Sequence, residues 1–463
     1  MNKTFAQWPD SLWRDGQLDW DFSCLPRDLS CDVAIIGAGF TGLWTAKHLL
    51  DMEPSLSIAI IDARQPGFGA SGRNGGWCSA LYPTSLDTIA AETSRETAVN
   101  LQLHLIRTVK DIGTYISEKN IQCGWSHSGT LSYSRNEAQL ARQNADLIMY
   151  RNLGLGEEFM RSLSSSESQH RIKITKSLGA SFTPHCASLN PAQLLDGLVT
   201  QLLAKGVTFF GDSIVSEIGI RSLRALTVHG PATVNCKWSV RATEGFTARL
   251  PKHRRTIAPL YSYMIATEPI PSRIWNDIGW DGRETWNDGR NMIVYAQRTS
   301  DDRIAFGGRG APYKFASRIG GQFDNKASVH QLLEATLHEL LPPTKSVEIT
   351  NRWGGSLGVH RDWHPSVLAD RTTGQVSAGG YVGDGVAFSC LAAEALSHEI
   401  LDTDNEIRTL PFMQHVSPKW EPEPLRWLGI NGMISLTQRA DEAEENNKTV
   451  GFLTRQLLQR LVP

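Results

Sequence analysis

The sequence predicts an α/β fold with a parallel sheet, and two observations lead to this prediction. The first is an apolar run at residues 32–36 that leads into a G-x-G-x-x-G stretch and then into a helical pattern of apolar residues. The second is another strand–glycine–helix junction at residues 379–385. A chain of 463 residues is long enough for two or three domains with a large core.

The composition is that of an ordinary globular protein, with 41% hydrophobic residues, 20% charged residues and a formal net charge of −2. Without a basic excess, no nucleic-acid partner is expected. No apolar run reaches the ~18 residues of a membrane span. The first 30 residues are polar and contain no signal-peptide core. Seven scattered cysteines without a C-x-x-C pair indicate reduced thiols, a cytoplasmic location and no metal site.

The first junction has the features of a dinucleotide-binding unit. Gly37 permits a tight turn, Gly39 lets the backbone approach a pyrophosphate, and Gly42 lets the helix pack closely on the strand. The helix N-terminus offers free N–H groups and a positive dipole end to phosphates. A second apolar strand ends at Asp62, whose carboxylate would accept hydrogen bonds from ribose hydroxyls. This motif alone fits either NAD or FAD.

Two glycine-rich segments favour the longer cofactor. The loop at 67–76 is mostly Gly, Ala and Ser around Arg73 and Asn74, which suits a backbone lying against a flat ring and a phosphate arm. The helix that follows the second junction would stabilise negative charge on a reduced flavin. The alternatives are a flexible surface loop and a helix cap without a ligand. Two such distant junctions suit one long cofactor held at both ends.

The remaining chain alternates helices with short strands. Helices are predicted at 95–119, 136–163, from Pro191, at 326–341 and from Val386 to Leu401. Strands are predicted at 129–134, 207–210, 261–270, 292–299, 303–308 and 346–353, with those between 261 and 308 antiparallel. After Pro411 a connector leads to a charged helical tail with Leu453, Leu457, Leu458 and Leu461 on one side.

Five segments together resemble a known family: Val33–Gly42, Gly67–Gly76, Ser262–Pro269, Asp302–Gly308 and Gly379–Ala387. The chain resembles the D-amino-acid oxidase superfamily of FAD-dependent oxidoreductases, and most of all the branch with γ-glutamylputrescine oxidase. The glycine-rich loop at 67–76 is its most specific motif. The resemblance spans about residues 30–405, so the last 55 or so residues lie outside the family core.

The resemblance implies a discontinuous Rossmann-like FAD-binding domain with an interleaved antiparallel-sheet substrate domain. The FAD-binding domain would comprise 30–85, 180–255 and 355–405, the substrate domain 86–179 and 256–354, and a C-terminal helical extension 406–463. The implied activity is oxidation of a C–N bond in a small amine or amino acid, with a γ-glutamylated amine among the candidates. A hydride passes to flavin N5 and the resulting imine hydrolyses. The oligomeric state stays open.

The resemblance also implies the FAD-binding positions. They are Gly37, Ala38, Gly39, Phe40, Thr41, Gly42, Asp62, Ala63, Arg64, Gly69, Ala70, Ser71, Gly72, Arg73, Asn74, Gly75, Gly76, Val215, Ala242, Gly383, Asp384, Gly385, Val386 and Ala387. Asp62 stands where many members have Glu, and either carboxylate binds ribose. Asp384 stands where the putrescine branch often has His, which places an acid near the flavin and argues against an identical substrate.

Three residues are candidates for the reacting centre. Arg309 and Arg361 would bind a substrate carboxylate, because a guanidinium pairs with it through two hydrogen bonds. His360 would deprotonate a substrate ammonium near neutral pH. The alternatives are ordinary salt-bridged arginines and a structural histidine. Cys78 follows the glycine-rich loop, which makes covalent attachment of the flavin to its thiol an alternative. The matched branch does not use this position for attachment, so noncovalent FAD is favoured.

Two other flavoprotein functions compete with amine oxidation. An FAD monooxygenase of the aromatic hydroxylase type shares the Gly-Asp pair at 383–384, but its following motif and a second nucleotide site are missing from the sequence. A noncatalytic electron-transfer flavoprotein subunit is disfavoured by the intact loop at 73–76 and the substrate-sheet segments.

Overall fold

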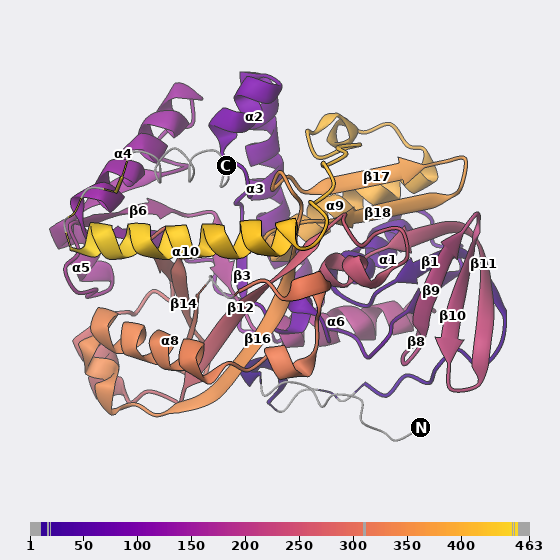
Figure 1. Ribbon diagram of the computed structural model, residues 1–463, viewed down its shortest axis with the longest axis horizontal. Coiled ribbons are helices and arrows are strands. Elements are labelled where there is room, and N and C mark those ends of the chain that lie inside the picture. The colour runs from indigo at the N-terminus through magenta and orange to yellow at the C-terminus, as the bar shows by residue number, and fades with distance from the viewer. Residues whose placement is uncertain are drawn as a thin grey trace.

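The computed structural model describes residues 11–15, 18, 20–308, 312–446, 448 and 450–451. Its strands form two eight-stranded sheets and one two-stranded ribbon. Figure 1 shows the first sheet beside α1 and α9, and the second sheet on the opposite side of the molecule.

The first sheet has a parallel centre, as the two apolar strands at its middle require. Its strand order is β17-β18-β11-β1-β2-β8, and β10 and β9 extend it from β11 as an antiparallel meander. The strands are β1 (Leu29–Ile36), β2 (Ile58–Ile61), β8 (Thr208–Phe210), β9 (Ile214–Gly219), β10 (Ser222–Thr227), β11 (Gly230–Arg241), β17 (Ser366–Asp370) and β18 (Gln375–Gly379). The central strand β1 pairs in parallel with both β11 and β2, so it is buried on both faces.

Helices cover one face of this sheet and form the main core. Val33 and Ile35 of β1 point into a cluster that includes apolar residues of five helices, whereas Ala34 and Ile36 face the meander. The helices around this sheet are α1 (Phe40–Met52), α2 (Leu86–Glu92), α3 (Arg95–Glu118), α6 (Pro191–Ala204) and α9 (Gly385–Leu401). Helix α9 packs along α1, which brings the two glycine-rich junctions to the same edge of the sheet.

The second sheet is antiparallel except where β13 pairs with β4. Its order is β16-β12-β15-β14-β13-β4-β6-β5. The strands are β4 (Thr130–Ser134), β5 (Arg161–Ser164), β6 (Gly179–Thr183), β12 (Ala258–Thr267), β13 (Thr285–Asp288), β14 (Val294–Arg298), β15 (Ile304–Gly308) and β16 (Ile349–Val359). Its helices are α4 (Glu137–Asn152), α5 (Ser165–Arg171), α7 (Ser272–Ile278) and α8 (Ala327–Leu340).

The remaining elements are short, apart from the C-terminal helix α10 (Leu425–Glu445). Strands β3 (Trp77–Ser79) and β7 (Cys186–Ser188) form the ribbon. The short 3-10 turns are η1 (Leu12–Arg14), η2 (Ala70–Gly72), η3 (Glu244–Arg249), η4 (Phe315–Ser317), η5 (Gly321–Phe323), η6 (Pro342–Ser346) and η7 (Glu406–Thr409).

The predicted fold class is confirmed, and one predicted helix is wrong in length. The helix expected over 136–163 ends at Asn152. Gly154 follows with a φ of +78°, and residues 161–164 then pair with β6 as a strand. The expected domain boundaries at 180 and 355 fall inside β6 and β16, so the domain division stays a prediction. The tail leucines Leu453, Leu457, Leu458 and Leu461 lie outside the described residues.

Candidate functional site

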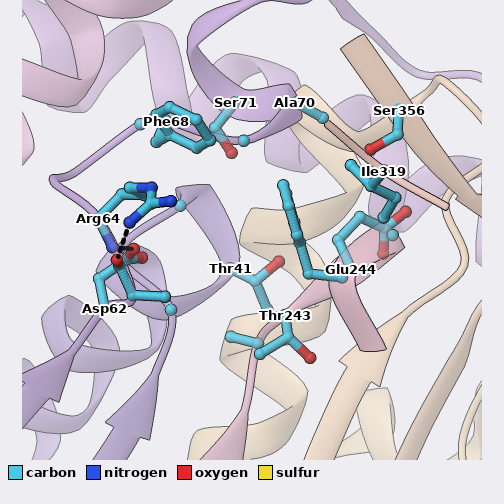
Figure 2. Close-up of a pocket in the computed structure, with 18 of the residues that line it drawn as sticks. Thr41, Asp62, Arg64, Phe68, Ala70, Ser71, Thr243, Glu244, Ile319 and Ser356 are labelled. Carbon is cyan, nitrogen blue, oxygen red and sulfur yellow. Dashed lines mark hydrogen bonds between the residues drawn. The ribbon is translucent and has the colours of Figure 1, made fainter. Parts of the chain in front are cut away.

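A cavity of about 320 Å³ lies where the carboxyl ends of β1, β2 and β11 meet the N-termini of α1 and α9. Ligands of parallel sheets bind at this end of the strands. Figure 2 shows Asp62 and Arg64 on one side of this first cavity, Ser71 and Phe68 on another, and Glu244 and Ile319 opposite them. The elements that line it come from every part of the predicted FAD-binding sequence.

The glycines at the first junction leave no room for side chains. Gly37 has a φ of +110°, and a Cβ there would lie 2.5 Å from the carbonyl oxygen of Ala242. A Cβ on Gly42 would overlap the carbonyl oxygen of Gly37, and one on Gly39 would lie 2.8 Å from Ser71 Oγ. Glycine at these three positions therefore permits the turn to pack closely against neighbouring backbone and Ser71.

Both glycine-rich junctions present an open helix N-terminus to the cavity. Gly39 and Asp384 are the N-cap residues of α1 and α9, and neither makes a side-chain cap hydrogen bond. The hydroxyls of Thr41 and Tyr381 lie 2.9 Å apart and link the two junctions directly. Backbone N–H groups and the positive ends of two helix dipoles thus converge on one cavity, which fits an anionic cofactor.

Asp62 is fixed at the end of β2 by two backbone donors. Its carboxylate accepts hydrogen bonds from the N–H groups of Ala38 and Arg64, each at 2.7 Å. Burial raises the pKa of Asp62, and these two hydrogen bonds act in the opposite direction. A carboxylate has about four acceptor positions, so Asp62 keeps capacity for ribose hydroxyls.

Glu244 lines the same cavity and has no counterpart among the predicted site residues. Its carboxylate accepts the N–H of Gly358 at 3.1 Å and the N–H of Gly380 at 3.0 Å. Burial raises the pKa of Glu244 to about 7, against the effect of these hydrogen bonds. Burial likewise lowers the pKa of Arg241 to about 10, while the nearby Glu244 acts in the opposite direction. No local motif in the sequence signals this residue, because its partners come from distant segments.

A second cavity of about 230 Å³ adjoins the first on the side of the antiparallel sheet. Residues shared by both linings are Ala70, Arg73, Asn74, Leu357, Gly383 and Val386. Four aromatic side chains form much of the second cavity's wall: Trp77, Tyr82, Tyr295 and Trp363. Its polar side chains include those of Ser79, Ser262, Asn287 and Asp384. An apolar wall with a few polar groups is typical of a small-molecule site.

Arg73 lies at the boundary between the two cavities. Its side chain is buried, and Nη1 pairs with Asp324 Oδ2 at 2.8 Å. Nε donates to the carbonyl of Phe68 at 2.8 Å, and the guanidinium lies 4.6 Å from the ring centroid of Phe68. The sequence predicts Arg73 as a site residue but not this carboxylate partner, which stands 251 positions away.

Most of the residues predicted to bind FAD come together around the cavities. Those that line the first are Gly37, Gly39, Phe40, Thr41, Asp62, Ala63, Arg64, Gly69, Ala70, Ser71, Arg73, Asn74, Val215, Ala242, Gly383, Gly385 and Val386. Gly75 and Asp384 line the second. The described residues Ala38, Gly42, Gly72, Gly76 and Ala387 line neither and support the turns around them.

The candidates for the reacting centre do not come together in this way. Arg361 pairs with Glu421 at 3.0 Å, and His360 is buried with Nδ1 2.7 Å from the carbonyl of His364. Neither belongs to the described residues that line the two cavities, and their catalytic roles stay a prediction. Burial lowers the pKa of His360. Arg309 lies outside the described residues.

The segment after β16 does contribute one residue that sequence reasoning missed. Trp363 lines the second cavity and has a φ of +65°, a left-handed conformation that is rare for a bulky side chain. The predicted residues His360 and Arg361 precede it in the same turn. The sequence therefore indicates the segment 360–363, but the direction of its turn decides that Trp363 is the side chain that reaches the second cavity.

A comparison with protein families decides between the cofactors. The model of the FAD dependent oxidoreductase family matches residues 32–399 of this chain. The chain belongs to this family. The resemblance given by the five sequence segments is therefore confirmed, and FAD is the cofactor of the family.

Relatives with known names agree with this membership. A probable oxidoreductase OrdL of Haemophilus influenzae is 24% identical over 402 residues, covering 84% of this chain and 87% of that protein. The γ-glutamylputrescine oxidoreductase of Escherichia coli is 24% identical over 387 residues, covering 83% and 87%. The crystal structure of glycine oxidase from Geobacillus kaustophilus matches with a TM-score of 0.69 at 17% identity, covering 84% of this chain and 99% of that one.

Among the described residues, no helix is long and apolar enough to cross a bilayer. The same part of the chain contains no group of three or more His, Cys, Asp or Glu side chains placed to hold a metal ion. The residues of the first cavity, in contrast, fit FAD through the glycine turns, the two helix N-termini and Asp62.

Proposed function

We propose that this chain oxidises a C–N bond of a small amine or amino acid, with FAD in the first cavity and the substrate in the second. The observation that carries the proposal is the junction of the two cavities, which share lining residues from both glycine-rich segments. A flat ring system at this junction would face the aromatic walls of the second cavity. Amines or amino acids also appear in the names of relatives, and a γ-glutamylated amine is among the candidate substrates.

The residues of the first cavity would bind the cofactor by complementary charge. The N-termini of α1 and α9 would face its anionic groups, and Asp62 would accept the ribose hydroxyls. When bound, FAD would accept a hydride from the substrate carbon next to nitrogen, and the imine would then hydrolyse. The chain's own task is to hold the substrate carbon in line and to keep water away.

The second cavity suits a neutral amine. Trp77, Tyr295 and Trp363 present ring surfaces to it, and a low-dielectric wall disfavours a charged ammonium. Hydride loss requires the free amine, which the ring surfaces favour, whereas the carboxylate of Asp384 in the same lining would stabilise the ammonium form. Tyr82 is no base, since burial raises the pKa of its hydroxyl and that oxygen is buried.

We further propose that FAD is held noncovalently. Cys78 is fully buried and belongs to the described residues outside both linings. Burial also raises the pKa of its thiol well above the ordinary range, so a nucleophilic thiolate is disfavoured. Acid precipitation of the purified protein is expected to leave the flavin in the supernatant. Colour that stays with the pellet would contradict noncovalent binding.

Anaerobic reduction by a substrate panel tests the function. The panel contains γ-glutamyl amines, N-methyl amino acids, D-amino acids and aminophosphonates, each added to the oxygen-free holoenzyme. We expect at least one class to bleach the oxidised flavin and to yield the corresponding carbonyl product. An unchanged spectrum with every amine would contradict the proposal, and flavin-dependent consumption of NADPH would point to a monooxygenase instead.

A further inference from the structure

Helix α10 lies outside the region that the family model matches, yet it contacts segments next to both cavities. Figure 1 shows it crossing the front of the molecule, from the side of α9 to the side of α4 and α5. Its two ends make different sets of polar contacts with the body. These contacts fall on two segments that supply cavity wall.

The first set of contacts surrounds Glu423, which stands just before α10. Its Oε1 accepts the hydroxyl of Tyr313 at 2.7 Å and the N–H of Ala316 at 3.0 Å. Arg426, itself buried, pairs with the same carboxylate at 2.9 Å. Asn431 adds a hydrogen bond from its side-chain amide to the carbonyl of Tyr313 at 3.2 Å. One half-buried carboxylate group thus connects the helix to residues 313–317.

The segment that receives these contacts is conformationally strained. Ala316 and Ser317 have φ values of +59° and +54°, in the left-handed region that side chains other than glycine rarely adopt. Such residues persist only where their surroundings fix them. Here the N–H of Ala316 donates to Glu423 and the N–H of Ser317 donates to the Tyr313 hydroxyl at 2.9 Å. The helix therefore helps to hold a conformation that the segment alone disfavours.

The same segment continues directly into the first cavity. Ile319, Gly320, Gly321 and Asp324 all line it. Asp324 is the partner of Arg73, which stands between the two cavities. A change in the position of residues 313–317 would therefore be transmitted within a few residues to the wall and to this ion pair.

The second set of contacts surrounds Asp441, near the other end of α10. Its carboxylate accepts the N–H and the side-chain amide of Asn291 and the N–H of Met292, each at 2.8 Å. Ile293, the next residue, lines the second cavity. Glu444 reinforces this end through an ion pair with Arg142 at 2.8 Å.

We propose that α10 is a strap whose Glu423 and Asp441 are positioning residues. Glu423 holds the 313–324 segment closed over the FAD cavity, and Asp441 holds residues 291–293 against the substrate cavity. The effect of Asp441 on turnover rests on the proposed function above. The effect of Glu423 on the 313–324 segment and on cofactor retention does not.

Limited proteolysis tests the first half without any substrate. Trypsin sites at Lys314 and Arg318 lie inside the segment, and cleavage there requires local opening. Glu423→Ala removes a charged acceptor of five hydrogen bonds, from Tyr313, Ala316, Arg426 and Trp427, so we expect cleavage about ten-fold faster or more. Glu442→Ala is the matched control, because Glu442 is exposed on the same helix. Among the described residues, the Glu442 side chain has no hydrogen-bond or ion-pair partner. Unchanged cleavage in Glu423→Ala, or equal acceleration in both variants, would overturn the proposal.

Cofactor release and kinetics separate the two ends of the strap. Glu423→Ala is expected to release FAD several-fold faster, with partial rescue in Glu423→Gln because the amide oxygen remains an acceptor. Asp441→Ala is expected to raise KM for the reducing amine several-fold while tryptic cleavage at 314–318 and FAD release stay unchanged. If Asp441→Ala instead releases FAD or lowers the thermal midpoint to the same extent as Glu423→Ala, α10 is only a general structural element and the strap is wrong. If no amine reduces the wild-type flavin, the proposed function fails, and the proteolysis and FAD-release results still decide the Glu423 half.

Discussion

At the residue scale, three of the charged side chains that line the first cavity are held by partners far away in the sequence. Asp62 is held by the N–H of Ala38 in the first junction and by the N–H of Arg64, and Arg73 is held by Asp324. Glu244 is held by N–H groups of two distant segments. These side chains are therefore fixed before any ligand arrives, which reduces the ordering needed on binding.

Replacement of Asp62 tests the cofactor site most locally. Asp62→Ala leaves the N–H groups of Ala38 and Arg64 without their acceptor and removes the acceptor for ribose hydroxyls. Lost hydrogen bonds to a charged group cost about 1.5–3 kcal/mol each, so FAD affinity is expected to fall at least ten-fold. Fluorescence titration of the apoprotein with FAD measures this. Asp62→Glu is the control and is expected to bind within a few-fold of the wild type, whereas equal affinity of the alanine variant would contradict the assignment.

The titration of Glu244 predicts a pH dependence of stability. Its folded pKa is about 7 against an ordinary value of 4.5, so the folded state binds the proton more tightly than the unfolded state does. This contribution is fully present below pH 4.5 and is lost as pH rises through 7. In urea unfolding of the apoprotein, the wild type is expected to lose free energy of unfolding relative to Glu244→Gln as the pH rises from 5 to 8. A difference that stays constant over this range would show that Glu244 does not titrate there.

At the scale of elements, the two strand–glycine–helix junctions are adjacent although 340 positions separate the linked residues Thr41 and Tyr381. Their helices α1 and α9 share one core cluster. Close packing at the first junction depends on Gly42, which lies against the backbone of Gly37. The cavity is therefore set by helix–strand contact distances as much as by the residues that line it.

A single added methyl group should disturb this packing. Gly42→Ala places a Cβ on the carbonyl oxygen of Gly37, where backbone rather than a flexible side chain must move. We expect a loss of about 1–3 kcal/mol in unfolding free energy and weak FAD retention. Thermal unfolding and the flavin-to-protein ratio of the purified variant measure both. The control is Gly432→Ala in exposed α10, where a Cβ meets open space and helix propensity is expected to rise slightly. Wild-type behaviour of Gly42→Ala would contradict the close packing.

Local periodicity explains which elements the sequence could predict. The strands and helix of the first junction follow from apolar patterns and glycines that lie within 31 residues of one another, from Asp32 to Asp62. The end of α4 was missed because an apolar pattern continues past Gly154 into β5, and pairing with β6 overrides it. Glu244 and Trp363 were missed because turn geometry and long-range contacts bring them to the cavities. The same long-range geometry places His360 and Arg361 outside the two linings, so their roles stay a prediction.

At the scale of the whole molecule, the site lies between two sheets that only long-range contacts hold in place. Arg73 follows β2 of the first sheet, whereas Asp324 lies between β15 and α8 on the second. Tyr313 and Trp363 share a buried cluster with Ile430 and Ile434 of α10, so the C-terminal helix joins the same boundary. The relative placement of the sheets thus sets the relative placement of the two cavities.

The ion pair between Arg73 and Asp324 should couple the two halves. Each single alanine variant leaves a buried charge without its partner and is expected to cost about 3–5 kcal/mol in unfolding free energy. The double variant should cost clearly less than the sum of the two single variants. Urea unfolding of the four proteins gives the coupling energy. Additive effects would show that the two residues act independently.

The central claim is that one cavity holds FAD and the adjoining cavity holds an amine, and parallel variants of the two cavities test it most directly. The measurement is FAD titration followed by anaerobic reduction with the most effective amine, for wild type, Asp62→Ala and Trp77→Ala. We expect Asp62→Ala to lose FAD affinity, and Trp77→Ala to bind FAD normally but to be reduced at least ten-fold more slowly. Normal amine-dependent reduction in Trp77→Ala, or loss of FAD from both variants alike, would contradict the account.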